Sequence, residues 1–196
     1  MTQTTRSLMI GFMTAGLACA AGPAGANGVD GEANHHVRSS NASIVALISL
    51  ASQQSGTFRA LIETIDASDG IVYVENGECG RGAQACLVSV TSDGRYRFLR
   101  VHVGMREADW DLMGSIGHEL RHTIEVLSNP SVTDTAGLHY FYLHTASTGG
   151  FLRPFETEAA VATGAAVRAE VQKYRRTSVA KPEYSEAEVS SGKRRR

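Results

Sequence analysis

The sequence predicts a single α+β domain in which a small antiparallel or mixed sheet of about three strands packs against several helices. Helical spacing of apolar residues recurs before residue 68 and after residue 109, and β-branched runs lie between them. The chain has 196 residues, 42% of them hydrophobic, which suffices for one core. A formal net charge of -1 excludes a strongly basic nucleic-acid-binding protein, and the lack of an 18-residue apolar run excludes a polytopic membrane protein.

Residues 1–26 have the features of an export signal. Arg6 precedes a short apolar stretch, and the small residues before Asn27 fit a cleavage site. We therefore expect an exported protein, periplasmic or secreted, with no membrane span in the mature chain. An uncleaved membrane anchor is the alternative. Residues 27–39 are polar and rich in Gly and Asn, which predicts a flexible leader.

The three cysteines have different expected roles. Cys19 lies within the predicted signal. A lipoprotein signal places Leu three residues before the cysteine, but Leu17 stands two residues before Cys19, so a lipoprotein is disfavoured. The mature chain keeps Cys79 and Cys86, and an even pair in an oxidising compartment predicts a disulfide. Free thiols are the alternative, and the six-residue spacing disfavours a zinc knuckle.

Two helices are expected at the start of the domain, which we place at residues 40–174. Ser40-Asn41 can cap the first, whose apolar positions include Ile44, Leu47 and Ile48. The second begins near Thr57, and Asp69-Gly70 ends it as a turn. Its buried face would hold Phe58, Leu61, Ile62 and Ile65.

Three strands follow, at 71–74, 86–90 and 96–103. Ser92-Asp93-Gly94 indicates a tight hairpin between the second and third strands. A glycine-rich loop, 75–84, joins the first two. We therefore expect a three-stranded meander. The third strand alternates and would turn one set of side chains to the core: Arg97, Leu99, Val101 and Val103.

The next predicted helix begins at Asp109 or Asp111 and ends at Asn129-Pro130. Its apolar stripe predicts the buried face and consists of Leu112, Ile116, Leu120, Ile124 and Leu127. The other face carries the polar residues His118, Glu119, His122 and Glu125.

This polar face contains the sequence His118-Glu119-Leu120-Arg121-His122. Side chains four residues apart lie one above the other on a helix, so His118 and His122 can offer two imidazoles to one ion. Glu119 lies beside them and can act as a general base on a metal-bound water. We therefore predict one Zn²⁺ ion, with Glu119 as the catalytic residue. Two solvated histidines on a polar face are the alternative.

The five-residue motif resembles the active helix of the zincin metallopeptidases, which pack an HExxH helix behind a small mixed sheet. The likeness covers residues 57–172 in arrangement, but only the motif is a close match. Residues 117–130 are also similar to exported bacterial proteins of the zincin type. The resemblance implies a zinc-dependent peptidase acting on a peptide or protein substrate.

The resemblance also bears on the third metal ligand. Metzincins place Gly and His where this chain has Glu125 and Ser128, which excludes that subgroup. Gluzincins take a Glu from a later helix, and here a helix is expected from about Phe155 to Tyr174. This gluzincin-like reading makes Glu156 the third ligand. Ala160 stands where gluzincins have an Asp, so the surroundings of the site differ from that pattern.

Other side chains are candidates for the same position. Glu158 lies on a more polar face of the later helix, and Glu125 lies on the motif helix itself. Three ligands along one straight helix converge poorly, so Glu125 is expected to orient His122 or a neighbouring Arg. His139 and His144 belong to a segment, 133–144, that periodicity assigns neither to helix nor to strand. A side chain of this segment could hydrogen-bond the oxyanion of a reaction intermediate, and the candidates are His139, Tyr140, Tyr142 and His144. The alternative is that all four side chains serve packing.

The tail, residues 175–196, is Ser-rich and ends in four basic residues, which predicts a disordered basic segment.

Two other functions remain open: an exported metal-binding protein without catalysis, and an envelope interaction domain. The chain also contains ExxH sequences, as di-iron bundles do, but one of the two, Glu32 to His35, lies in the leader. The predicted strands disfavour a bundle.

Overall fold

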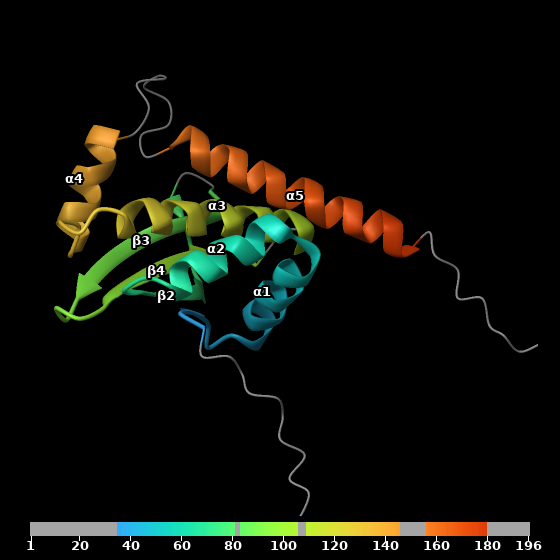
Figure 1. The fold of residues 1–196 in the computed structure, drawn as a ribbon, viewed down its shortest axis with the longest axis horizontal. Helices are drawn as coiled ribbons and strands as arrows, with labels where there is room; N and C mark the ends of the chain where they lie inside the picture. Colours follow the sequence, from blue (N-terminus) through green and yellow to red (C-terminus); the bar gives the residue numbers. More distant parts are fainter. Residues whose placement is uncertain (1–34, 81–82, 106–108, 146–155, 180–196) are drawn as a thin grey trace, which may run out of the picture. The chain divides into compact units, whose positions relative to one another are not determined.

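The computed structural model describes residues 35–80, 83–105, 109–145 and 156–179. The predicted signal, residues 1–26, and most of the predicted leader and tail lie outside these ranges. The described elements confirm an α+β fold of five helices and a four-stranded mixed sheet (Figure 1). In chain order they are β1 (Val37–Arg38), α1 (Ala42–Gln54), α2 (Gly56–Asp66), β2 (Gly70–Asn76), β3 (Ala85–Ser92), β4 (Arg97–Val103), α3 (Asp109–Leu127), α4 (Thr135–Thr145) and α5 (Glu158–Val179).

Side-chain caps start the first two helices. The Asn41 side chain accepts hydrogen bonds from the backbone N–H groups of Ser43 and Ile44, which confirms the expected cap of α1. Ser55 ends α1 and also caps α2, because its Oγ accepts from the Phe58 N–H at 2.9 Å. One residue therefore fixes the corner between the two helices.

The sheet has the order β1-β2-β4-β3, so the expected meander is wrong. Strand β4 lies between β2 and β3 and pairs with β2 in parallel, from Gly70 opposite Arg97 to Asn76 opposite Val103. The hairpin between β3 and β4 is confirmed as an antiparallel pair. The hairpin signal predicts only the pairing of β3 with β4. It does not predict which of the two lies beside β2, and the long 75–84 loop allows β3 to lie at the edge of the sheet.

The end of the predicted leader is ordered. Val37–Arg38 form β1, which pairs in parallel with Val72 and Tyr73 of β2. Asp66, at the end of α2, holds the residues before this strand: its carboxylate lies 2.6 Å from His35 Nδ1 and accepts the His36 N–H at 2.7 Å. These contacts, together with the buried side chain of Val37, explain why this otherwise polar segment adopts an extended conformation.

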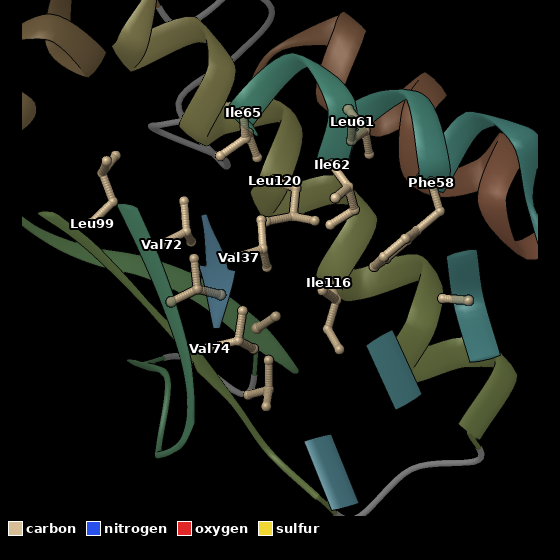
Figure 2. Packing of buried hydrophobic residues seen from close by; sticks show 14 of the residues in the cluster. Val37, Phe58, Leu61, Ile62, Ile65, Val72, Val74, Leu99, Ile116 and Leu120 are labelled. Atoms are coloured by element: carbon tan, nitrogen blue, oxygen red, sulfur yellow. The ribbon is translucent and has the colours of Figure 1, made fainter. Parts of the chain in front are cut away.

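The core lies between the helices and one face of the sheet. Figure 2 shows Phe58 and Ile62 of α2 beside Ile116 and Leu120 of α3, near Val72 of β2. The alternation predicted for β4 is confirmed, because its four alternate residues from Arg97 to Val103 are all buried. The other alternate side chains of β4 are partly or fully exposed, as expected for a sheet with one covered face.

Helix α3 is more deeply buried than its sequence predicts. The apolar stripe is confirmed at Leu112, Ile116 and Leu120, which are at most 1% exposed. The opposite face is not a solvated one, because Glu119 and His122 are only 7% and 4% exposed. Helix α5 and strand β3 also contact this helix, so polar side chains of the motif lie inside the protein.

The remaining helices differ in part from expectation. Residues 135–145 form a helix rather than a strand, and Asp134 caps it by accepting the Gly137 N–H at 2.7 Å. Helix α5 begins at Glu158, so Glu156 precedes the helix instead of lying in its first turn. It continues to Val179, five residues beyond the predicted end at Tyr174, so the predicted disorder is wrong for residues 175–179, and the rest of the predicted tail lies outside the described residues.

The predicted disulfide between Cys79 and Cys86 is present and closes the loop between β2 and β3. It ties this loop to the first residues of the edge strand β3. In the described part of the chain, no helix is both long and apolar enough to cross a membrane.

Arg97 is the one buried arginine among the described residues, at 5% exposure. Its guanidinium pairs with both carboxylate oxygens of Asp69 at 2.7 and 2.8 Å, and its charge and hydrogen bonds hold the pKa of Asp69 below its usual value. It also donates to the carbonyls that end α3, at Val126, Leu127 and Asn129. Arg97 thus gives the Leu127 carbonyl a donor at the end of the helix, and it adds a second donor at Val126 and Asn129, whose carbonyls also accept backbone N–H groups.

We expect Arg97→Met to lower the free energy of unfolding by about 3 kcal/mol, because it removes the buried charged donor that joins β4 to Asp69 and to the Leu127 carbonyl at the end of α3. Arg100→Met is the matched control on the same strand, since its pair with Glu75 is solvent-exposed. That change should cost less than about 1 kcal/mol. Urea unfolding of both variants measures the difference, and equal losses would contradict the assigned role of Arg97.

Candidate metal centre

Helix α3 brings the two motif histidines together. His118 and His122 are one turn apart, and their Nε2 atoms lie 3.1 Å from each other. Two neutral imidazoles cannot both present lone pairs at this distance without repulsion, so a shared proton or a shared cation is required between them. Burial, and secondarily the nearby His122, lowers the pKa of His118. His118 is therefore poised to offer its Nε2 lone pair at neutral pH.

Helix α5 packs closely against α3 at glycine positions. A Cβ placed on Gly164 would lie 3.0 Å from the Gly114 carbonyl oxygen and 3.1 Å from His118 Cβ. A Cβ on Gly117 would lie 2.9 Å from a methyl of Val167. The buried face of α5 consists of Ala160, Gly164, Val167 and Val171, and its small residues allow the close contact with the motif helix.

This close contact delivers Glu156 to the histidines. Its Oε2 atom lies 3.3 Å from His118 Nε2. The same atom is buried and has no hydrogen bond among the described residues. His118, His122 and Glu156 form a group whose ligand atoms all lie within 4.8 Å of one another, and which can hold a metal ion.

The geometry fits a tetrahedral ion. Ligand atoms bound at about 2.0–2.1 Å to a tetrahedral zinc lie about 3.3 Å apart. The Nε2–Nε2 distance is 3.1 Å and the Nε2–Oε2 distance is 3.3 Å. Two imidazoles and one carboxylate are also a donor set of catalytic zinc sites, which leave the fourth position open. These two distances and the donor chemistry therefore suit such an ion, and the remaining pair of ligand atoms, on His122 and Glu156, lies within 4.8 Å.

The other candidates for the third ligand lie outside this group. Glu158 is exposed on the first turn of α5. His139 and His144 are exposed on α4, where His144 Nδ1 lies 2.8 Å from the Tyr140 carbonyl oxygen. Among the described residues, the structure thus brings together the three ligands predicted from the sequence and none of these rivals.

Glu125 contacts the far side of His122. Its Oε2 atom lies 3.0 Å from His122 Nδ1, so it orients the imidazole whose Nε2 faces the group. Burial alone would raise the pKa of Glu125, but hydrogen bonds with His122 and Thr157 outweigh burial and lower it. The expectation that Glu125 orients His122 agrees with this geometry.

Glu119 lies on the inner side of the motif. Its Oε2 accepts the backbone N–H of Leu87 in β3 at 2.8 Å, and its Oε1 lies 3.9 Å from His118 Nε2. Burial raises the pKa of Glu119 to about 7, against the opposing effects of His122 and the Leu87 N–H. The Leu87 N–H therefore fixes the carboxylate next to a candidate ligand atom.

Helix α4 packs beside the centre. The ring of Tyr142 meets that of His122 edge-on, with centroids 5.3 Å apart. Thr135, at the start of α4, exchanges hydrogen bonds with the backbone of Val90 in β3, which ties the helix to the edge strand. Burial and the carboxylates of Glu119, Glu125 and Glu156 raise the pKa of Tyr142, so its phenol stays protonated.

Three neighbours of the centre were missed by the sequence analysis. Thr157 had a signal that could have found it, because a Thr just before a helix is a typical cap. Arg168 pairs with Asp111 and donates to Ser115 at 3.0 Å beside Gly114, and its position depends on how α5 crosses α3. The Leu87 contact uses a backbone N–H, for which no side-chain pattern exists.

Comparison with family models, curated proteins and solved structures finds no significant match for this chain. The metal-binding group is therefore supported by its own geometry, and the zincin resemblance stays a prediction. The same holds for zinc as the ion and for peptide hydrolysis as the activity.

The raised pKa of Glu119 has a consequence for the metal-free protein. A carboxyl group whose pKa is higher in the folded state contributes stability below its unfolded pKa, and this contribution is lost as the pH rises through the folded pKa. Between pH 4.5 and about 7, wild type should therefore lose about 3 kcal/mol relative to Glu119→Gln.

Urea unfolding in the presence of a chelator, at intervals from pH 4 to 8, measures this difference. Glu119→Gln is the suitable reference because it keeps the size of the side chain and cannot titrate. Parallel stability curves for the two proteins would show that Glu119 is not held in a desolvated environment.

Proposed function

We propose that this protein is a zinc-dependent metallopeptidase in which His118, His122 and Glu156 hold one Zn²⁺ ion and Glu119 is the general base. The observation that carries the proposal is the convergence of three ligand atoms from two separate elements, with the buried Oε2 of Glu156 otherwise lacking a hydrogen bond. A buried carboxylate oxygen without a donor is costly, and a cation removes this cost.

The choice of zinc follows from the donor set. Imidazole and carboxylate ligands in a compact, three-ligand arrangement favour a small ion that accepts four-coordination. Calcium and magnesium prefer six or more oxygen ligands, which the described residues at this position do not offer.

When bound, zinc would supply a Lewis acid for a carbonyl oxygen and lower the pKa of a water towards about 7. Glu119 has the position and the proton affinity for the remaining steps. With Oε2 held by Leu87, Oε1 faces the ligand atoms and can accept a proton from the attacking water. Once protonated, the same carboxyl group can return that proton to the leaving amine.

We further infer that the protein is exported. The signal-like residues 1–26 support this inference. The Cys79–Cys86 disulfide is compatible with it, because disulfides persist in oxidising compartments. The substrate would then be a peptide or protein of the periplasm or the medium.

The proposed function is tested by metal analysis and hydrolysis assays on purified wild type, His118→Ala and Glu119→Gln. We expect about one zinc per wild-type chain and its loss in His118→Ala. Glu119→Gln should keep the zinc and hydrolyse an unstructured protein such as casein at least about 100-fold more slowly than wild type. Each variant removes one function of the centre and leaves the rest of the fold intact.

Glu158→Gln is the matched control, since Glu158 is an exposed glutamate two residues from Glu156. It should match wild type in zinc content and activity. Full hydrolysis by Glu119→Gln would reject Glu119 as the base. A wild-type protein that holds zinc but cleaves no peptide would instead favour the exported metal-binding protein without catalysis.

A further inference from the structure

We infer that Glu125 and Thr157 form a clasp that couples the second and third ligands of the metal centre, so that neither His122 nor Glu156 is positioned independently of the other. This inference rests on the proposed metal site. It assigns a positioning role to Thr157, whose hydroxyl, among the described residues, is hydrogen-bonded to Glu125 and to the Ala160 N–H and not to a candidate ligand atom.

The first half of the clasp is the contact between Glu125 and His122. Glu125 uses Oε2 for this contact, at 3.0 Å from Nδ1, and its side chain is only 14% exposed. A carboxylate on Nδ1 fixes the tautomer of the imidazole, so that Nε2 presents its lone pair to the ion. Glu125 therefore sets both the rotation and the ligand atom of His122.

The second half is the contact between Glu125 and Thr157. The Thr157 hydroxyl donates to Oε1 of the same carboxylate at 2.8 Å. The hydroxyl oxygen also accepts the Ala160 N–H at 3.1 Å, so Thr157 caps α5 at the same time. One hydroxyl thus joins the start of α5 to the carboxylate that orients His122.

The clasp matters because Glu156 lies outside the helix. It precedes Glu158, the first residue of α5, so helical hydrogen bonds do not fix its backbone. Thr157 is its direct chain neighbour, and anchoring Thr157 to α3 fixes the position from which the Glu156 side chain reaches His118. Glu125 is further held by Arg121, whose Nε lies 3.5 Å from Oε1.

A cap that merely stabilises α5 would be the structural alternative for Thr157. The two roles differ in what they change. Loss of a cap lowers the stability of the fold, whereas loss of the clasp weakens metal binding in a protein that is still folded. The clasp also predicts that the effects of changing Glu125 and Thr157 on metal affinity are not additive.

The test is Zn²⁺ affinity, measured by competition with a chromophoric chelator, for Thr157→Val, Glu125→Gln and the double variant. Each single change should weaken zinc binding by about 10- to 100-fold, the usual effect of losing a partner of a metal-binding histidine. The double variant should be little weaker than the worse single one, because both changes break the same chain of hydrogen bonds. Thr157→Ser, which keeps the hydroxyl, should restore the wild-type affinity.

Asn41→Ala is the control for a lost cap, because Asn41 caps α1, which supplies none of the candidate ligands. It should lower the melting temperature of the metal-free protein without changing zinc affinity. The visible spectrum of the Co²⁺-loaded proteins gives a second readout, since it reports ligand geometry. We expect it to change in Thr157→Val and to stay unchanged in Asn41→Ala.

The outcomes separate this inference from the proposed function. If wild type binds zinc and Thr157→Val binds it equally well, the clasp is refuted while the metal site stands. Additive losses in the double variant would also refute the coupling. If wild type takes up no divalent metal, the proposed function fails, and the clasp fails with it.

Discussion

The close contact between α3 and α5 is the constraint on which the candidate site depends. The motif helix can supply two imidazoles, but a third ligand at a useful angle has to come from another element. Gly114 on α3 and Gly164 on α5 allow the two helix backbones to approach where larger side chains would separate them. Figure 1 shows α5 running alongside α3. Glu156 reaches His118 because the backbones of α3 and α5 approach each other closely.

The same packing buries ionisable groups in the protein interior, where loss of hydration raises their free energy. Glu119 and His122 are buried, and the Glu156 oxygen nearest to the histidines has no hydrogen-bond donor. Burial of such groups without compensation costs several kcal/mol and is retained when the groups have a task. Arg97 is different, because hydrogen bonds to Asp69 and to the end of α3 account for its burial. The cluster around His118 is therefore the place where a bound cation would compensate the burial of these groups.

Local features of this fold were predictable from the sequence, and the features that depend on how elements meet were not. The Asn41 cap, the alternation of β4 and the one-turn spacing of the histidines follow from periods and caps that a chain segment carries by itself. The insertion of β4 beside β2 and the pairing of Val37 depend on contacts between distant segments. Glu156 was predicted through the resemblance to gluzincins, which take a ligand from a later helix, and the more polar face of Glu158 decided between the two glutamates.

The central claim is that two imidazoles and one carboxylate bind a single zinc ion. X-ray absorption spectroscopy of the zinc-loaded protein tests it directly, since it reports the number and type of ligand atoms. We predict about two imidazole nitrogens and one or two oxygens at about 2.0–2.1 Å, with one imidazole lost in His122→Ala and a protein oxygen lost in Glu156→Ala. A spectrum that shows one imidazole or none in wild type would contradict the account.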